Sequence, residues 1–229
     1  MMKKTTTLIL FIIFTLGCSN DNSDNDNNNI NTGKLIKIVQ VDNNDNETTT
    51  AIFTYNGNNI VTSTTTDLEG IFKTNCIYEN GKLVKLERYT NDIRKENEDL
   101  SFTYDGQNIS TSYGYDGSTT LFTNKYTYNS NGQMILKKQY NNDKYCCETS
   151  YTYDSKGNIS NYIYDDKINP LYHVLPMAYN KINITSKNNI ISEGDRSYSY
   201  TYDDRNYPIQ VIETHKYKPK TIVTTYFYE

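Results

Sequence analysis

The sequence predicts an all-β fold: an antiparallel meander of repeated β-hairpins forming one twisted, curled sheet, like a solenoid, with one loop or short-helix insertion. Two observations lead to this prediction. Variants of a nine-residue pattern, Tyr-Thr-Tyr-Asp-Ser-Lys-Gly-Asn-Ile at 151–159, return from one end of the expected mature protein to the other. The composition holds 23 tyrosines and no tryptophan, and tyrosine favours half-buried strands over helices.

The pattern reads as one hairpin. Tyr151 and Tyr153 share a face of a strand because successive side chains alternate between the two faces. The segment 154–157 then turns the chain, and Ile159 lies at the start of the returning strand.

The apolar residue after each turn recurs at a nearly constant step of about 25 residues, which indicates a repeat of two strands and their connections. These residues are Leu35, Ile60, Leu83, Ile109, Met134, Ile159, Ile190 and Ile209. The strand before each turn carries a tyrosine, and we expect these rings to pave one face by stacking on the next unit. They are Tyr55, Tyr78, Tyr104, Tyr128, Tyr153 and Tyr202.

Two kinds of turn are predicted. The dipeptides Asn56-Gly57, Asn80-Gly81 and Asp105-Gly106 suit two-residue type I′ hairpins, in which both central positions need positive φ. The longer segments 129–132 and 154–157 begin with Asn or Asp and place glycine in the left-handed position. These glycines are backbone requirements, so we assign the turns no catalytic role.

Two places interrupt the repeat. The segment 168–189 adds Pro170 and Pro176 and several large apolar residues, which predicts a loop or short helix packed back across the sheet. Pro208 predicts an edge strand or a bulge, and 221–228 is the expected last strand.

The N-terminus predicts export. Lys3 and Lys4 precede an apolar stretch at 8–16, half the length of a membrane-spanning helix, so 1–17 is expected to be a signal peptide. Gly17-Cys18 resembles the lipidation site of bacterial lipoproteins, in which Cys18 would carry the lipid that holds the protein on a membrane. An ordinary cleaved signal with an incidental cysteine is the alternative.

The segment 18–32 is polar up to Ile30 and predicts a disordered tether, followed by a repeat domain at 33–229. The aspartates of the segment 18–32 also resemble the surface-export signal of Bacteroidota-type lipoproteins. The formal net charge is −4, and losing the two lysines with the signal peptide lowers it further, so no basic footprint for nucleic acid exists.

The recurring Tyr-Thr-Tyr-Asp-x-x-Gly-Asn-Ile core resembles the tyrosine-aspartate (YD) repeats of the RHS family, which form long hairpins in a spirally wound sheet. With the lipoprotein-like start and the proline-containing insertion, the chain is similar to Bacteroidota-type surface lipoproteins with a domain of unknown function, which implies an outer-membrane location. Two units depart from the pattern: 76–79 lacks the Asp, and 203–206 lacks the glycine. The resemblance implies no reaction.

Motifs of known enzyme classes are missing from the sequence, so we expect no enzyme, no catalytic residue, no metal site and no cofactor. His215 is interpreted as an exposed strand residue. Cys76, Cys146 and Cys147 are expected to be buried free thiols. A disulfide from Cys76 to one of the pair stays open, since adjacent cysteines in a strand face opposite sides.

Two functions follow from these patterns. The first is a lipid-anchored binding or structural module that presents its sheet to a protein or glycan partner. The alternative is a carrier of a small ligand or glycan, or an enzyme, with a pocket between the sheet and the insertion. The residues expected at that pocket are Tyr172, His173, Leu175, Met177 and Tyr179.

Overall fold

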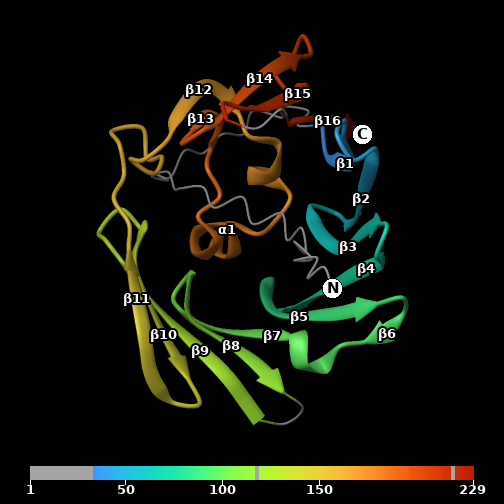
Figure 1. Cartoon of the computed structure of the whole chain (residues 1–229). Helices are drawn as coiled ribbons and strands as arrows, with labels where there is room; N and C mark the ends of the chain where they lie inside the picture. Colours follow the sequence, from blue (N-terminus) through green and yellow to red (C-terminus); the bar gives the residue numbers. More distant parts are fainter. Residues whose placement is uncertain (1–32, 117–118, 218–219) are drawn as a thin grey trace, which may run out of the picture.

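The computed structural model describes residues 33–229, apart from 117–118 and 218–219. Their strands form one 16-stranded antiparallel sheet that curls around a single short α-helix (Figure 1), which confirms the predicted fold class. The expected signal peptide at 1–17, Cys18 and the tether at 18–32 lie outside the described residues. No helix in the described part of the chain has the length and apolar character needed to cross a membrane.

The strands follow one another as hairpins. The elements of the first half are β1 (Leu35–Asp42), β2 (Glu47–Asn56), β3 (Asn59–Asp67), β4 (Gly70–Glu79), β5 (Lys82–Thr90), β6 (Ile93–Arg94), the 3-10 helix η1 (Glu96–Glu98), β7 (Leu100–Asp105) and β8 (Asn108–Asp116). Those of the second half are β9 (Thr119–Tyr128), β10 (Met134–Asn141), β11 (Lys144–Ser150), β12 (Ile163–Ile168), the 3-10 helix η2 (Pro170–His173), α1 (Met177–Asn183), β13 (Asn188–Glu193), β14 (Arg196–Tyr202), β15 (Pro208–His215) and β16 (Thr221–Tyr228).

The order of strands across the sheet is β11-β10-β9-β8-β7-β5-β4-β3-β2-β1-β16-β15-β14-β13-β12, with β6 paired to β5 alone. The first and last strands are therefore neighbours inside the sheet, and the free edges are β11 and β12 from the middle of the chain. Both edges come to the same side of the molecule (Figure 1). β16 has the predicted bounds. β15, which begins at Pro208, is an interior strand with an irregular register, so the predicted bulge is confirmed and the edge position is wrong.

The apolar residues of the repeat form the core. Ile60, Leu83, Ile109 and Met134 are 0% exposed, and Leu35, Ile159 and Ile190 are also buried. Ile209 is the exception at 39% exposure. The register shift opposite Tyr202 places Pro208, not Ile209, at the buried position.

The turn chemistry is partly as predicted. Asn80 and Gly81 both have positive φ, as type I′ requires. In the turns after Asn56 and Asp105 the two central residues are Gly57-Asn58 and Gly106-Gln107, and only the glycine has positive φ, so the type I′ prediction is wrong there.

The longer turns use a carboxylate or amide as expected. The Oδ1 atom of Asp154 accepts the backbone N–H groups of Lys156 and Asn158, and Asn129 makes the same pair of contacts in its own turn. In the unit without glycine, Asn206 adopts the left-handed conformation with φ of 65°. Asparagine tolerates this conformation, so the turn keeps its shape.

The segment 151–159, whose nine residues define the repeat pattern, is itself irregular in the structure. Residues 151–159 turn back as predicted, with an antiparallel bridge between Tyr153 and Ile159 and a backbone hydrogen bond from Asp154 N–H to the Asn158 carbonyl at 2.7 Å, but they form no named strand of the sheet. The segment links the two free edges of the sheet, and on the side of β10 the Tyr151 N–H donates to the Ile135 carbonyl at 2.9 Å.

The repeated tyrosines connect neighbouring units through their hydroxyl groups. Five hydroxyls, four from the repeat tyrosines and one from Tyr228, each donate a hydrogen bond of 2.5–2.8 Å to the carbonyl of a buried residue that is first or second in an earlier strand. The pairs are Tyr55 to Leu35, Tyr104 to Leu83, Tyr128 to Ile109, Tyr153 to Met134 and Tyr228 to Pro208. The tyrosines thus join neighbouring units by hydrogen bonding, and the ring of Tyr202 stacks on that of Tyr200 in its own strand, with centroids 5.9 Å apart.

Two repeat tyrosines depart from this arrangement: the Tyr202 hydroxyl donates to the Asp165 carboxylate, and Tyr78 gives rise to a testable prediction. The Tyr78 hydroxyl is buried with no hydrogen-bond partner, and burial raises its pKa. We expect Tyr104→Phe to lower the free energy of unfolding by about 1 kcal/mol, because a satisfied hydrogen bond is lost, and Tyr78→Phe to be neutral or slightly stabilising. Urea unfolding of the two variants compares them directly. An equal loss in both would contradict this role of the hydroxyls.

Candidate functional site

The insertion lies inside the curl of the sheet (Figure 1), as the sequence predicted. It begins with η2, where the Asn169 side chain accepts the backbone N–H of Leu171, and continues into α1. Asn180 of α1 is 1% exposed and donates from Nδ2 to the carbonyls of Tyr172 at 2.7 Å and Leu175 at 2.9 Å. The buried amide therefore fixes the helix against the turn before it.

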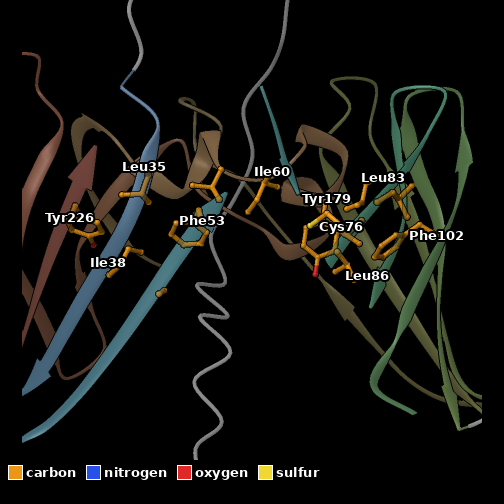
Figure 2. Close-up of a cluster of buried hydrophobic side chains, with 14 of the residues drawn as sticks. Leu35, Ile38, Phe53, Ile60, Cys76, Leu83, Leu86, Phe102, Tyr179 and Tyr226 are labelled. Atoms are coloured by element: carbon orange, nitrogen blue, oxygen red, sulfur yellow. The ribbon is translucent and has the colours of Figure 1, made fainter. Parts of the chain in front are cut away.

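The helix contacts the sheet through Tyr179. Its ring meets that of Phe102 edge to face, with ring centroids 5.4 Å apart. Figure 2 shows Tyr179 among Cys76, Leu86 and Phe102, which reach it from strands β4, β5 and β7. The apolar cluster thus joins the insertion to the inner face of the sheet.

A partly open cavity of about 240 Å³ lies between the insertion and strands β2 to β5. Its apolar wall combines side chains from both parts: Phe53, Ile60, Phe72, Cys76, Leu86, Leu171, Val174, Leu175 and Tyr179. An apolar cavity of about 150 Å³ suffices to hold benzene, so this space is large enough for at least one ring or a short alkyl chain.

Most of the remaining lining is polar and comes from β3, β4, β5 and η1, while Asn183 at the end of α1 and Thr185 after it add polar groups on the insertion side. It includes two basic residues, Lys73 and Arg88, and two acidic ones, Asp67 and Glu98, beside Ser63 and several threonines. Arg88 donates from Nη1 to Thr74 at 2.7 Å, and Lys73 lies 5.9 Å from the centre of the Tyr89 ring. Because this part of the lining carries two positive and two negative side chains, it favours a ligand whose polar group has no strong net charge.

The Cys76 thiol belongs to the apolar wall. Burial raises its pKa to about 11, and Arg88 opposes this shift only in part. The thiol therefore stays protonated at neutral pH and acts as a small apolar side chain, not as a nucleophile.

Of the five residues expected at the pocket, the structure brings Leu175 and Tyr179 to the cavity wall. Tyr172 is buried but is not among the residues that line the cavity, and its carbonyl accepts a hydrogen bond from Asn180. Met177 is half-buried at the start of α1 and does not line the cavity. His173 is placed as the last residue of η2. The sheet side of the cavity carried no local sequence signal, since Phe53 and Leu86 resemble any other strand residues.

The remaining candidates from the sequence lie apart from the cavity. His215 is 16% exposed beside Glu213, with Nε2 2.8 Å from the carboxylate, so the expectation of an exposed residue is wrong. The three described cysteines are free, as expected, but Cys146 and Cys147 are exposed on β11 and not buried. No group of three or more His, Cys, Asp or Glu side chains suited to a metal ion occurs among the described residues.

Comparisons with known proteins place the fold. The sequence matches no protein-family model and no curated protein. A solved structure described as a porin-like protein from Bacteroides uniformis superposes with a TM-score of 0.56 at 15% identity, over 86% of this chain and 98% of that one. A second porin-like protein, from Bacteroides vulgatus, has a TM-score of 0.40 at 15% identity, over 86% and 99% of the two chains. The superposition on the Bacteroides uniformis protein shows that the two chains share a fold.

Proposed function

We propose that the protein is a lipid-anchored binding protein of the outer membrane, and that its cavity takes a small ligand with an apolar body. The observation that carries the proposal is the cavity between the insertion and the inner face of the sheet. A space that is mostly apolar with a few polar groups at one end is the usual form of a small-molecule site. Cys18 would supply the attachment to the membrane through its lipid.

The shape of the lining suggests the orientation of the ligand. Phe53, Leu86 and Tyr179 belong to the apolar wall, whereas Asp67 at the end of β3 and Arg88, two residues after Leu86 on β5, belong to the polar part of the lining. An amphipathic molecule would bury its apolar part against the apolar wall and direct an uncharged polar group toward the mixed charges. A polar sugar would leave the apolar wall without a partner, so a simple glycan fits this cavity less well.

The location rests on two observations that point the same way. The residues before 33 follow the pattern of a bacterial lipoprotein, and the shared fold occurs in a protein described as porin-like. The resemblance to tyrosine-aspartate repeats and the absence of enzymatic activity remain part of the proposal. Labelling cells with a radioactive fatty acid tests the anchor: label should enter the wild-type protein and not Cys18→Ser. An unlabelled wild-type product would contradict the anchor.

The cavity itself is tested by filling it. Ala51 lines the cavity and is 3% exposed, so Ala51→Leu adds carbon atoms to the empty space. We expect the neutral fluorescent probe N-phenyl-1-naphthylamine to bind the wild type, and to bind this variant about tenfold more weakly, since a few methylene groups in a pocket are worth this much.

A neighbouring residue supplies the matched control. Ile52 is 46% exposed on the other face of the same strand, so Ile52→Leu should leave probe binding unchanged. Thermal unfolding of both variants confirms that they fold. Equal probe binding by the wild type and Ala51→Leu would remove the cavity as the site.

A further inference from the structure

Two neighbouring hairpin tips carry strongly exposed apolar side chains. Leu68 lies in the turn between β3 and β4 and is 76% exposed, and Ile93 follows the turn after β5 and is 64% exposed. These are the highest exposures of any leucine or isoleucine in the described part of the chain. Single exposed apolar residues are common on protein surfaces, whereas a group of them marks a surface that binds a partner.

The turn after β5 does not need an apolar residue beside it. Residues 91–92 and 142–143 are both Asn-Asp with positive φ at each position, 50° and 63° in the first turn and 48° and 62° in the second. The residue after the second turn is Lys144, which is exposed like Ile93. The same turn therefore forms with a charged residue at this position, so folding alone does not explain Ile93.

Hydrogen bonds hold the two tips together. Asn91 donates its backbone N–H to the Ile71 carbonyl at 2.7 Å, and its Oδ1 accepts the Ile71 N–H at 2.8 Å. Ile71 is itself 43% exposed. The segments 67–71 and 91–98, which we call the tip surface, thus present three exposed apolar side chains from a fixed backbone.

The tip surface borders the cavity. Phe72 pairs with Thr90, and Thr90 pairs with Ile93, so the three side chains share one face of the sheet. Phe72 and Thr90 line the cavity, as do Asp67 and Glu98 of the tip surface itself. A partner bound to the tip surface would therefore lie at the edge of the cavity.

The charge of the tip surface indicates the kind of partner. Its exposed carboxylates belong to Glu69, Asp92, Glu96 and Glu98. Its two basic residues are less exposed, and Arg94 already forms ion pairs with Glu87 and Asp99. Because like charges repel, an anionic lipid surface is disfavoured here, whereas the Lys or Arg side chains of a protein would be attracted.

We propose that the tip surface is a docking site for a basic amphipathic segment of another protein. The apolar side chains of that segment would cover Leu68, Ile71 and Ile93, and its Lys or Arg side chains would meet the surrounding carboxylates. Amphipathic helices are commonly recognised through a few apolar anchors in this way. The tip surface is present whether or not the cavity holds a ligand, so this inference goes beyond the proposed function and does not rest on it.

The test uses a synthetic helical peptide of about 18 residues, five turns long, with leucines on one face and lysines on the other. The fluorescein-labelled peptide is titrated with the full chain carrying Cys18→Ser, and fluorescence anisotropy measures binding. We expect saturable binding to this protein. Adding Leu68→Ser and Ile93→Ser together should weaken binding about tenfold or more, because both apolar anchors are lost.

The carboxylates are tested separately. Glu69→Gln with Asp92→Asn should weaken peptide binding about threefold or more, and the effect should shrink at high salt, where exposed charges are screened. A peptide with glutamate in place of each lysine should bind much more weakly. Equal binding of the two peptides would overturn the proposal, because charge would then play no part.

Ile163 supplies the matched control, since it is 60% exposed but lies on the edge strand β12. Ile163→Ser should leave peptide binding unchanged, and so should Ala51→Leu, which fills the cavity and not the tip surface. Circular dichroism confirms that each variant retains its sheet. Because Ala51→Leu affects only the cavity probe and the tip variants affect only the peptide, the two proposals fail independently.

Four results would overturn the proposal. The first is no binding of the lysine peptide, and the second is equal binding by the double tip variant and the parent protein. The third is an equal loss in Ile163→Ser or a loss in Ala51→Leu, which would place the peptide elsewhere. The fourth is sedimentation of the parent protein with phosphatidylcholine vesicles that the double tip variant abolishes, since the tip surface would then bind lipid.

Discussion

Replacing Asp99 with alanine is expected to lower the free energy of unfolding by about 3 kcal/mol, because it removes one partner from a largely buried ion-pair network. The Asp99 side chain is 4% exposed, and its Oδ2 lies 2.6 Å from Arg94 Nη2 and 3.2 Å from Lys85 Nζ. Arg94 and Lys85 are about one-third exposed and keep contact with water, which limits the loss.

The Asp99 carboxylate also accepts a backbone N–H of β5 at a point where β7 no longer pairs with that strand. Strands β5 and β7 pair only through Lys85–Ser101 and Leu86–Leu100 before they diverge. Beyond that point the Asp99 Oδ1 accepts the backbone N–H of Arg88 at 3.0 Å, in the place of a strand carbonyl. Asp99→Ala leaves this N–H without its partner, whereas Asp99→Asn can keep an acceptor there and should cost less.

The same contacts make the effect depend on pH. Burial would raise the pKa of Asp99, but hydrogen bonds from Arg94, the Arg88 backbone and Lys85 outweigh it and hold the pKa below its usual range. A lowered pKa gives stability that is complete above the unfolded value of about 3.9 and is lost as the pH falls through the folded value. The difference between wild type and Asp99→Asn should therefore shrink below about pH 4.

Urea unfolding at pH 7 and in steps down to pH 2.5 measures both effects. Asp166 is the control, because its carboxylate also forms an ion pair, 3.4 Å from Lys167 Nζ, but the Asp166 side chain is 77% exposed to water. Asp166→Ala should change the unfolding free energy by less than about 0.5 kcal/mol. A loss at Asp99 no greater than this control, or one that grows in acid, would contradict the role of the network.

Local patterns in the sequence were sufficient to predict the hairpins. A tyrosine strand, a turn with Asn, Asp or Gly, and an apolar residue define each unit, and the apolar residues are buried as expected from Leu35 to Ile190. The dipeptides Asn91-Asp92 and Asn142-Asp143 were missed. All four of these residues have positive φ and form two-residue turns without any glycine.

The order of the sheet could not be predicted in the same way. Turn signals specify which strands are neighbours in the chain, but the pairing of β1 with β16 joins residues between 180 (Asp42 and Ile222) and 193 (Leu35 and Tyr228) positions apart, and no local pattern encodes it. For the same reason the sequence placed only the insertion side of the cavity. Which strands face Leu175 and Tyr179 depends on the curvature of the whole sheet.

The other large effect is expected at Leu83, which is 0% exposed in the layer of apolar residues beneath the insertion. Leu83→Ala removes three carbon atoms from a closely packed position, and we expect the free energy of unfolding to fall by about 2–5 kcal/mol. For a domain of this size, each kcal/mol corresponds to about 2–4 °C in Tm. Differential scanning calorimetry should therefore show a fall of about 10 °C.

Ile77 provides the comparison for Leu83 because it belongs to the preceding strand β4 and is 38% exposed. Ile77→Ala removes the same number of carbon atoms, but from a side chain that already contacts water, so its cost should stay below about 1 kcal/mol. Tm values that fall equally in the two variants would mean that the repeat residue is no better packed than its exposed neighbour. The layer from Leu35 to Met134 would then not be the core that holds neighbouring hairpins together.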